Sequence, residues 1–414
     1  MGLSIPLLAA ALAAAVPACP NGAYKAAGGN TLALATATPQ SGKTTQRYAF
    51  LDGRVGFLGE PNAPVCRDGA MTDGATAYAP VALHRTPAHF ASAGVTLSGL
   101  LVEPAAAAPG APLVVLVHGS ERYGSVAASS MPYVLAAQGI ASFVYDKRGT
   151  GESGGAYTQN FETLAADVVA ASAEARRLAD GRYGRFGLFG GSQGGWVAPL
   201  AAQTVKPDFV VVGYGLVLSP LEEDSEQVFD ELRRRNAPGD VLAAAREVTD
   251  ATGAVIASHF TAGFEDLARV KARYADAPWL NEIRGEFTGD ILAMTEDQLR
   301  RDGPARLDDL GVLWRYDSMP VLRGLAMPQL WVLAGADREA PGTLTRERLA
   351  VLRKEGRPIE VTVYPDTDHG IYEFVTLPDG SRKATKVADG YFRLVADWMK
   401  GESHPPYGAA VPGP

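Results

Sequence analysis

The stretch Gly190-Gly191-Ser192-Gln193-Gly194 decides the fold of this chain. It follows the apolar run Phe186-Gly187-Leu188-Phe189 and precedes a segment from Trp196 to Ala202 that has the composition of a helix. A serine between a strand and a helix sits on a very tight turn, so small residues must flank it and its hydroxyl projects above the sheet. We therefore predict that Ser192 is a nucleophile. The alternative is a glycine-rich turn that only lets a helix pack closely on a strand.

Short apolar runs alternate with helical segments on both sides of this stretch. Such runs are typical of parallel strands that helices bury on both faces. Between Phe161 and Leu178, apolar residues recur at spacings of three and four, which predicts an amphipathic helix. The predicted strands are 113–117, 141–145, 186–189, 209–212, 330–333 and 359–363. The pattern predicts an α/β fold with a mainly parallel central sheet.

The chain is longer than one compact unit requires. A single core rarely grows past roughly 250–300 residues, so 414 residues imply a core with additions. Residues 221–317 lack strand-like runs and are charged, which predicts a helical cap insertion. Residues 19–92 carry short β-like runs and many turn residues, which predicts a small strand-rich N-terminal module. The core then comprises 93–220 and 318–402, and 403–414 is expected to be a flexible tail.

Composition excludes some partners. Apolar residues make up 47% of the chain and charged residues 20%, as in ordinary globular proteins. The 38 Lys and Arg residues are outnumbered by 46 Asp and Glu residues, and no basic block could follow a phosphate backbone. We therefore expect no nucleic-acid partner.

The first residues have the pattern of an export signal. The chain is almost continuously apolar from Leu3 to Val16 and then reads Val16-Pro17-Ala18, small residues of the kind that precede signal-peptidase cleavage. No Lys or Arg precedes this run, so a buried or disordered N-terminus is the alternative. We expect residues 1–18 to be a signal peptide and the protein to be periplasmic or secreted. No later stretch has the roughly 18 apolar residues of a stable membrane span.

Cys19 and Cys66 are the only cysteines. In an oxidising compartment they would form one disulfide. Two alternatives remain open. Val16-Pro17-Ala18-Cys19 resembles a bacterial lipobox, in which Cys19 would carry a lipid anchor, or both thiols could be free. Without further cysteines or a nearby histidine pair, the sequence gives no support for a zinc site or another metal site.

A serine hydroxyl needs a base that removes its proton during attack. His369, in Asp366-Thr367-Asp368-His369-Gly370, directly follows the last apolar run and so falls at the sheet edge where Ser192 emerges. We predict that His369 is this base. The alternative is that His369 is an ordinary solvated histidine on a loop. The other histidines lie before the core, in the cap, in the tail or at the end of an early strand: His84, His89, His259, His404 and His118.

The acid that orients the base should lie between serine and histidine in the chain. Asp337 follows the predicted strand 330–333, which places its carboxylate at the same edge as Ser192. We predict Asp337 as the catalytic acid, with Asp317 in reserve. The alternative role for Asp337 is a helix N-cap, and one carboxylate can serve both purposes.

The oxyanion formed on attack needs two backbone donors. One is the N–H of Gln193, and the other should come from the loop after strand 113–117, where we assign Ser120 or its immediate neighbour. His118 at the start of this loop is expected to bond backbone and to be structural. The side chains predicted to line a substrate pocket are Glu121, Tyr123 and Trp196.

The ordered set of motifs resembles the α/β-hydrolase superfamily over residues 94–400. It comprises His118-Gly119, the element from Asp146 to Ser153 (Asp-Lys-Arg-Gly-Thr-Gly-Glu-Ser), Gly190 to Gly194, Asp337 and His369. The second element is similar to that of esterases, acyl-thioester hydrolases and serine-peptidase-like relatives, where it is chiefly structural. The resemblance therefore gives Arg148 and Ser153 no catalytic part. The N-terminal module and the sequence of the cap depart from the family pattern.

The resemblance implies a two-step acyl transfer through an acyl-serine, with no metal or organic cofactor. We expect an esterase that acts on a small-molecule carboxylic ester. A serine peptidase or amidase and an acyl thioesterase are alternatives on the same fold, although export would separate a thioesterase from its cytosolic substrate. Because this scaffold also hosts inert proteins, a non-catalytic binding protein is the alternative from another class. The oligomeric state is not predicted.

Overall fold

A nine-stranded sheet forms the centre of the molecule. The computed structural model describes residues 19–37 and 44–413. In the central sheet β10 to β15 run parallel. At one edge β9 pairs antiparallel with β11 and β8 pairs antiparallel with β9, and at the other edge β19 pairs antiparallel with β15. The strands, in spatial order, are β19 (Val411–Pro412), β15 (Ile359–Tyr364), β14 (Gln329–Ala334), β13 (Phe209–Gly213), β12 (Phe186–Gly191), β10 (Leu113–Val117), β11 (Ala141–Tyr145), β9 (Val95–Pro104) and β8 (Leu83–Ser92). The predicted α/β-hydrolase fold with its mainly parallel sheet is confirmed.

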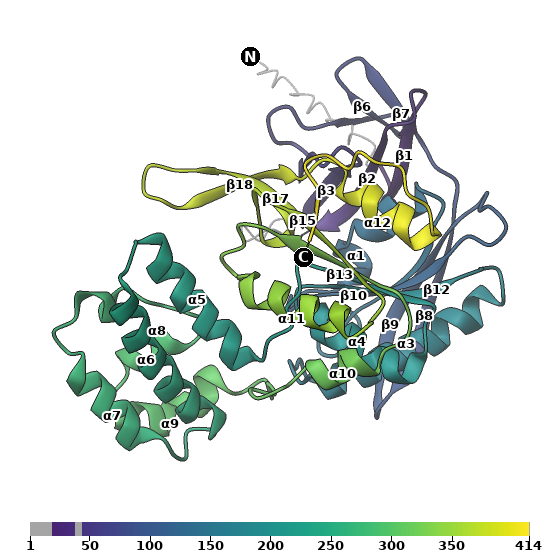
Figure 1. Cartoon of the computed structure of the whole chain (residues 1–414). Coiled ribbons are helices and arrows are strands. Elements are labelled where there is room, and N and C mark those ends of the chain that lie inside the picture. Colours follow the sequence, from purple (N-terminus) through teal and green to yellow (C-terminus); the bar gives the residue numbers. More distant parts are fainter. Residues whose placement is uncertain (1–18, 38–43, 414) are drawn as a thin grey trace, which may run out of the picture.

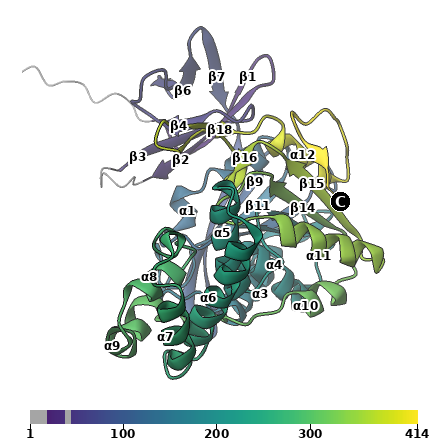
Figure 2. The same ribbon diagram turned by 60° about the vertical axis from the view of Figure 1, so that its left-hand side comes forward.

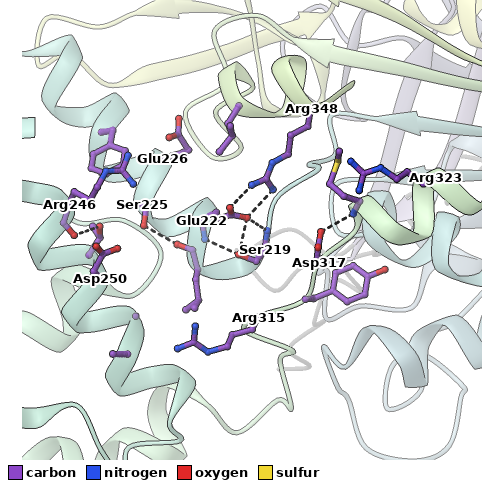
Figure 3. Close-up of a pocket in the computed structure, with 18 residues that line it drawn as sticks. Ser219, Glu222, Ser225, Glu226, Arg246, Asp250, Arg315, Asp317, Arg323 and Arg348 are labelled. Atoms are coloured by element: carbon purple, nitrogen blue, oxygen red, sulfur yellow. Dashed lines mark hydrogen bonds and ion pairs between the residues drawn. The ribbon is translucent and has the colours of Figure 1, made fainter. Parts of the chain in front are cut away.

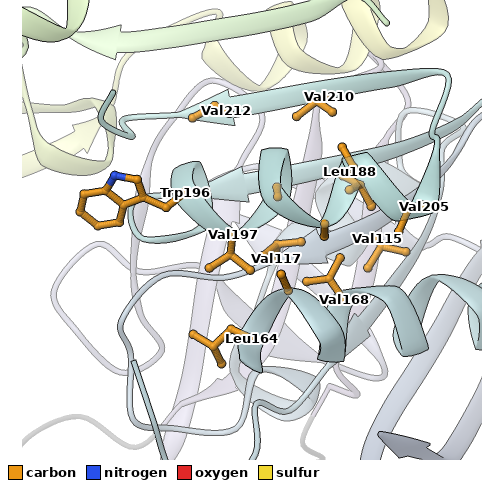
Figure 4. Packing of buried hydrophobic residues seen from close by; sticks show 14 of the residues in the cluster. Val115, Val117, Leu164, Val168, Leu188, Trp196, Val197, Val205, Val210 and Val212 are labelled. Atoms are coloured by element: carbon orange, nitrogen blue, oxygen red, sulfur yellow. The ribbon is translucent and has the colours of Figure 1, made fainter. Parts of the chain in front are cut away.

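Helices α3 (Phe161–Ala179) and α4 (Gly194–Val205) cover one face of this sheet. Helix α3 begins after Asn160, whose side chain accepts a hydrogen bond from the N–H of Thr163. Its apolar residues lie on one face, and Val168 is fully buried against the sheet valines that Figure 4 shows. Burial of such a side chain contributes roughly 1.5–3 kcal/mol. This packing fixes α4, and with it the turn that holds Ser192.

The opposite face carries α1 (Ser125–Ala128), α2 (Met131–Ala136) and α12 (Tyr391–Lys400). Helices α10 (Met319–Gly324) and α11 (Thr343–Lys354) flank β14 in the chain. The parallel strands are buried at nearly every residue, which agrees with the continuous apolar runs of the sequence.

A separate seven-stranded antiparallel sheet precedes the core and lies at one end of it (Figure 1). One side of this sheet encloses a small core around Tyr24, Phe50 and Met71, and the other side packs on α1 and α2. Its strands in spatial order are β4 (Val55–Phe57), β3 (Thr45–Phe50), β2 (Thr31–Ala37), β1 (Gly22–Ala26), β7 (Thr76–Pro80), β6 (Ala70–Asp73) and β5 (Val65–Arg67). We call it the N-terminal sheet.

Cys19 and Cys66 form a disulfide that ties the start of the described chain to β5. Because the bridge uses both sulfurs, neither a lipid on Cys19 nor two free thiols agrees with the structure. Disulfides persist in oxidising compartments, so the bridge indicates an extracellular or periplasmic location. The expected signal peptide, 1–18, lies outside the described residues.

Two expected boundaries differ from the structure. The N-terminal module was expected to extend to residue 92, but β8 pairs with β9 over its whole length and so belongs to the central sheet. The segment 403–414 was expected to be a flexible tail, but Val411 and Pro412 pair with β15 at the sheet edge. Backbone pairing decides both cases, and the turn-rich composition of these segments does not reveal it.

A helical insertion separates β13 from β14. Its helices enclose their own apolar core around Phe229, Val248 and Ile283, and they gather on one side of the central sheet in Figures 1 and 2. Two of them begin with capping boxes, Ser219 with Glu222 and Thr295 with Gln298. The insertion comprises α5 (Pro220–Arg234), α6 (Gly239–Ala257), α7 (Phe264–Arg273), η1 (Pro278–Asn281), α8 (Thr288–Ala293) and α9 (Glu296–Leu307).

A short three-stranded sheet follows β15 in the chain. It consists of β16 (Thr367–Asp368), β17 (Tyr372–Thr376) and β18 (Arg382–Val387), and the helical turn η2 (His369–Ile371) lies between the first two. Within the described ranges, no helix combines the length and the apolar character needed to span a bilayer.

Candidate active site

Ser192 occupies the turn between β12 and α4 in a left-handed backbone conformation, with φ of 52°. An L-residue adopts this conformation only at a cost of roughly 1–2 kcal/mol, and close packing around the turn holds it there. A Cβ on Gly190 would lie 2.2 Å from the carbonyl oxygen of Gly194, and a Cβ on Gly194 would lie 2.4 Å from that of Val117. The glycines are therefore required by the tightness of the turn.

His369 connects Ser192 with Asp337. Its Nε2 lies 3.0 Å from the Ser192 hydroxyl oxygen, and its Nδ1 lies 3.0 Å from Oδ2 of Asp337. A carboxylate only accepts hydrogen bonds, so Nδ1 carries the proton and the lone pair of Nε2 faces the hydroxyl. This arrangement allows His369 to take the Ser192 proton while Asp337 holds the ring in place.

Backbone donors hold the Asp337 carboxylate. Its Oδ1 accepts hydrogen bonds from the N–H groups of Glu339 at 3.0 Å and Ala340 at 2.8 Å. The Asp337 carboxylate is buried, and these hydrogen bonds orient it so that its other oxygen, Oδ2, contacts His369. Asp317, the reserve candidate, accepts from the N–H of Met319 instead and takes no part in this cluster.

The pKa of His369 is raised above its ordinary value. Burial alone would lower it, but the hydrogen bond to Asp337 and the negative charges of Asp337, Glu339 and Asp368 outweigh burial. Raising the pKa makes the imidazole a stronger base, and it also means that the neutral form required for attack exists only at higher pH.

Acidic residues that the sequence analysis missed surround this site. Oε1 of Glu339 lies 3.5 Å from Nε2 of His369. Glu223 at the start of α5 has a pKa well above its ordinary value because of burial and of the neighbouring charges of Glu286, Glu339, Asp224 and Asp337. Burial also raises the pKa of Glu339. These carboxylates come from the insertion and from the loop after β14, so only the folded chain brings them together.

The loop after β10 passes next to the nucleophile. A Cβ on Gly119 would lie 3.1 Å from the Ser192 Cβ. Buried Lys147 donates a hydrogen bond from Nζ to the Gly119 carbonyl at 2.6 Å, and the Tyr157 hydroxyl donates to the Ser120 carbonyl at 2.6 Å. Because N–H and C=O of one trans peptide point in opposite directions, the Lys147 contact directs the N–H of Ser120 away from Lys147. Gln193 is buried directly beside Ser192 at the start of α4.

His118, expected to be structural, has its Nε2 2.8 Å from the carbonyl oxygen of Tyr145. Burial, together with the charge of Lys147, lowers the pKa of His118 to about 3. The ring is therefore neutral, and Nε2–H donates to that carbonyl. This contact attaches the start of the loop to β11.

The residues expected to line a substrate pocket separate into two groups. Glu121 and Tyr123 line a cavity of about 190 Å³ beside the site. Trp196 does not, because it is 6% exposed, stacks on Phe161 and donates from Nε1 to the Leu218 carbonyl at 2.7 Å. The expectation for Trp196 is therefore corrected, because its position on α4 directs its side chain into the hydrophobic core.

The element from Asp146 to Ser153 supports the loops around the site. Asp146 accepts from the N–H groups of Val126 and Glu152, and Ser153 bonds the Asp146 carbonyl. Arg148 makes a two-point contact with Asp167, which is fully buried. None of these side chains contacts Ser192 or His369 in the described part of the chain.

A larger cavity of about 860 Å³ lies where the insertion joins the core (Figure 3). Arg348 pairs with Glu222 in this cavity, whereas Arg323 pairs with Glu355, which does not line it. Ser192, Asp337 and His369 do not line this cavity, whereas Asp317, the reserve candidate, does.

Residues 109–372, more than half of the chain, match the family described as Serine aminopeptidase, S33. Among solved structures, an esterase from Pyrococcus furiosus is 16% identical, with a TM-score of 0.42 over 70% of this chain and 85% of that one. Acylaminoacyl peptidase from Pyrococcus horikoshii is 14% identical, with a TM-score of 0.44 over 84% of this chain and 52% of that one.

Proline iminopeptidase from Mycobacterium smegmatis is 14% identical, with a TM-score of 0.43 over 76% of this chain and 98% of that one. No curated protein matches the chain. The matched range contains Ser192, Asp337 and His369. The chain belongs to the serine aminopeptidase S33 family and is a hydrolase of the α/β-hydrolase superfamily, as its motifs predicted.

Proposed function

We propose that this protein is a serine hydrolase that cleaves a carboxylic ester through an acyl-serine intermediate. One observation carries the proposal: the imidazole of His369 lies 3.0 Å from both the Ser192 hydroxyl oxygen and the Asp337 carboxylate. A hydroxyl, a base and an orienting acid in contact are what activation of a serine requires.

In the proposed reaction, Ser192 attacks the ester carbonyl while His369 takes the hydroxyl proton. The N–H groups of Gln193 and Ser120 are the proposed donors to the resulting oxyanion. The alcohol leaves with the proton held by His369, and the acyl group stays on Ser192. His369 then activates a water molecule that releases the acid. Apart from the ester and the water molecule, the groups named in this reaction are side chains and backbone groups of the chain.

Labelling with a fluorophosphonate tests the nucleophile. We expect the wild-type protein to be labelled at Ser192 and the Ser192→Ala variant not to be labelled. Loss of nitrophenyl ester hydrolysis should accompany the loss of labelling. Undiminished labelling or hydrolysis in Ser192→Ala would contradict the proposal, as would a wild-type protein that is never labelled, which would indicate a binding protein instead.

A second candidate is cleavage of substrates with a free amino group, as the family name suggests. The observation that favours it is a group of carboxylates: Glu339 lies 3.5 Å from Nε2 of His369, and the charges of Glu339 and Glu286 act on Glu223. An ammonium group would relieve the mutual repulsion of these carboxylates. Comparing aminoacyl nitroanilides with nitrophenyl esters separates the two candidates. Preference for the anilides, lost in Glu339→Gln, would favour the peptidase.

We further propose that the insertion, residues 221–317, acts as a cap that controls access to the site. It contacts the loop that carries Asp337, because Gln227 on α5 donates from Nε2 to the Glu339 carbonyl at 2.6 Å. Deleting residues 225–312 should change the substrate preference more than the fluorophosphonate labelling of Ser192. Complete loss of labelling in a folded deletion variant would contradict this role.

A further inference from the structure

The cavity of about 190 Å³ beside the site lies between the N-terminal sheet and the carboxyl ends of the central strands. Its walls come from three parts of the chain. The N-terminal sheet contributes Arg47, Ala49 and Val55, the central strands contribute residues such as Leu116 and Phe189, and further walls come from α1, α2, α12 and the segment around β17.

The cavity reaches the residues that hold the proposed nucleophile and base. Gly191 and Gly370 line it, and they directly neighbour Ser192 and His369 in the chain. Gly119, whose Cβ position would lie 3.1 Å from the Ser192 Cβ, lines it as well. Tyr214 does too, with its ring centre 5.0 Å from that of His369. The cavity therefore lies next to the turn that carries Ser192, although the side chains of Ser192 and His369 do not themselves line it.

Polar groups gather at the end of the cavity near Ser192. The carboxylate of Glu121 lies near Gly119, since a Cβ there would be 3.2 Å from Oε2 of Glu121. The hydroxyl of Tyr391 would lie 2.7 Å from a Cβ on Gly213, at the end of β13. The rest of the lining is mixed: apolar side chains such as Ala49, Val55 and Met131 stand beside Ser125, Ser129 and Ser130.

The volume also indicates what the cavity accepts. Clefts that hold whole drug-sized ligands span roughly 300–1,000 Å³, so about 190 Å³ suits one arm of a substrate. The apolar part of the lining, which includes Val55, Leu116 and Phe189, suits an ester with an unbranched aliphatic acyl chain.

Two contacts fix the N-terminal sheet as a wall of this cavity. The guanidinium of Arg47 donates to the hydroxyl of Tyr372 on β17. The N–H of Val387 on β18 donates to the Gly53 carbonyl at 2.9 Å. The N-terminal sheet is thus attached to the strands that follow His369, and the length of the cavity depends on its position.

We propose that this cavity receives the acyl chain of the substrate and that the N-terminal sheet limits the length of that chain. This inference rests on the proposed serine esterase reaction. It assigns a substrate class, esters of short to medium unbranched carboxylic acids, and it gives a role to the N-terminal sheet.

Two substitutions with opposite effects on the cavity test the proposal. Val55→Phe fills it from the N-terminal sheet, and Met131→Ala enlarges it from α2. Val65→Phe is the matched control, because Val65 lies on β5 of the same sheet, is 49% exposed and does not line the cavity. Each variant is assayed with nitrophenyl esters from acetate to decanoate, and labelling by a small fluorophosphonate reports an intact Ser192 site.

In Val55→Phe we expect kcat/KM for the hexanoate and octanoate esters to fall by about tenfold or more relative to the acetate ester. The reason is that each methylene group that an apolar pocket no longer accommodates costs roughly tenfold or more in kcat/KM. In Met131→Ala the preferred chain should lengthen, and the control should keep the wild-type profile. Unchanged chain-length profiles in both labelled variants would overturn the acyl cavity alone. Wild-type protein that is neither labelled nor active on any ester would overturn the proposed function and this inference together.

Discussion

The Glu339 carboxylate lies 3.5 Å from Nε2 of His369, the same ring nitrogen that lies 3.0 Å from the Ser192 hydroxyl oxygen. A negative charge at this position stabilises the protonated imidazole. The Glu339 charge would therefore assist proton abstraction from Ser192. It would also keep His369 protonated, and so unable to act as a base, up to a higher pH. The pH dependence of the reaction should report this contact.

We predict that Glu339→Gln shifts the acid limb of the pH profile to lower pH. The pKa of His369 is raised partly by the Glu339 charge, so removing that charge lowers it, and the neutral base then exists at lower pH. The measurement is kcat/KM for a nitrophenyl ester against pH. Glu265→Gln, an exposed carboxylate on α7, should leave the profile in place. An acid limb that stays or moves to higher pH in Glu339→Gln would refute this prediction.

Lys147→Met should lower kcat with little change in KM. The lost hydrogen bond to the Gly119 carbonyl frees the peptide whose N–H we assign to the oxyanion. Removing one oxyanion donor costs about 10²–10³-fold, so misplacing one should cost at least about tenfold. Steady-state kinetics on a short ester measure the effect, with exposed Lys25→Met as the control. Equal kcat in both variants would show that Lys147 does not position the loop.

Cys66→Ser should destabilise the N-terminal sheet. The disulfide closes a loop with a sequence separation of 47, for which chain entropy gives about 4 kcal/mol. Urea unfolding followed by tyrosine fluorescence should show the loss, and thiol titration of the denatured wild-type protein should find no free thiol. Two titratable thiols in the wild type, or equal stability in Cys66→Ser, would count against the bridge.

Arg148→Met should destabilise the core without removing the chemistry. It leaves the fully buried Asp167 carboxylate without its cation, and breaking a buried pair in this way costs about 3–5 kcal/mol. The ion pair of the exposed Arg177 with Glu174 provides the contrast, because solvent screens it and Arg177→Met should leave the stability nearly unchanged. Urea unfolding measures both variants. A purely structural role of Arg148 would be contradicted if Arg148→Met had normal stability. It would also be contradicted if folded Arg148→Met were not labelled at Ser192.

The parts of the site that follow from the sheet could be predicted from the sequence. Ser192, Asp337 and His369 each follow a buried apolar strand, and the carboxyl ends of parallel strands meet at one edge. The motif order therefore places all three residues together without knowledge of the helices. Whether they carry out catalysis stays a prediction until the labelling experiment is done.

The surroundings of the site could not be predicted in the same way. Glu223 and Glu339 meet because α5 packs on the loop after β14, and no spacing in the sequence encodes that contact. Val55 lines the acyl cavity because two sheets are attached side by side. Trp196 was misplaced for the related reason that a composition typical of a helix does not say which face meets the sheet.

The two residues of β19 protect an otherwise open strand. Val411 and Pro412 cover the outer edge of β15, and the N–H of Gly413 extends the contact to the Val361 carbonyl at 2.7 Å. An uncovered edge strand presents unpaired backbone groups to other molecules and promotes aggregation. Shortening the protein by its last few residues, or pulling them away with a carboxyl-terminal affinity tag, would therefore compromise solubility long before it disturbed the fold.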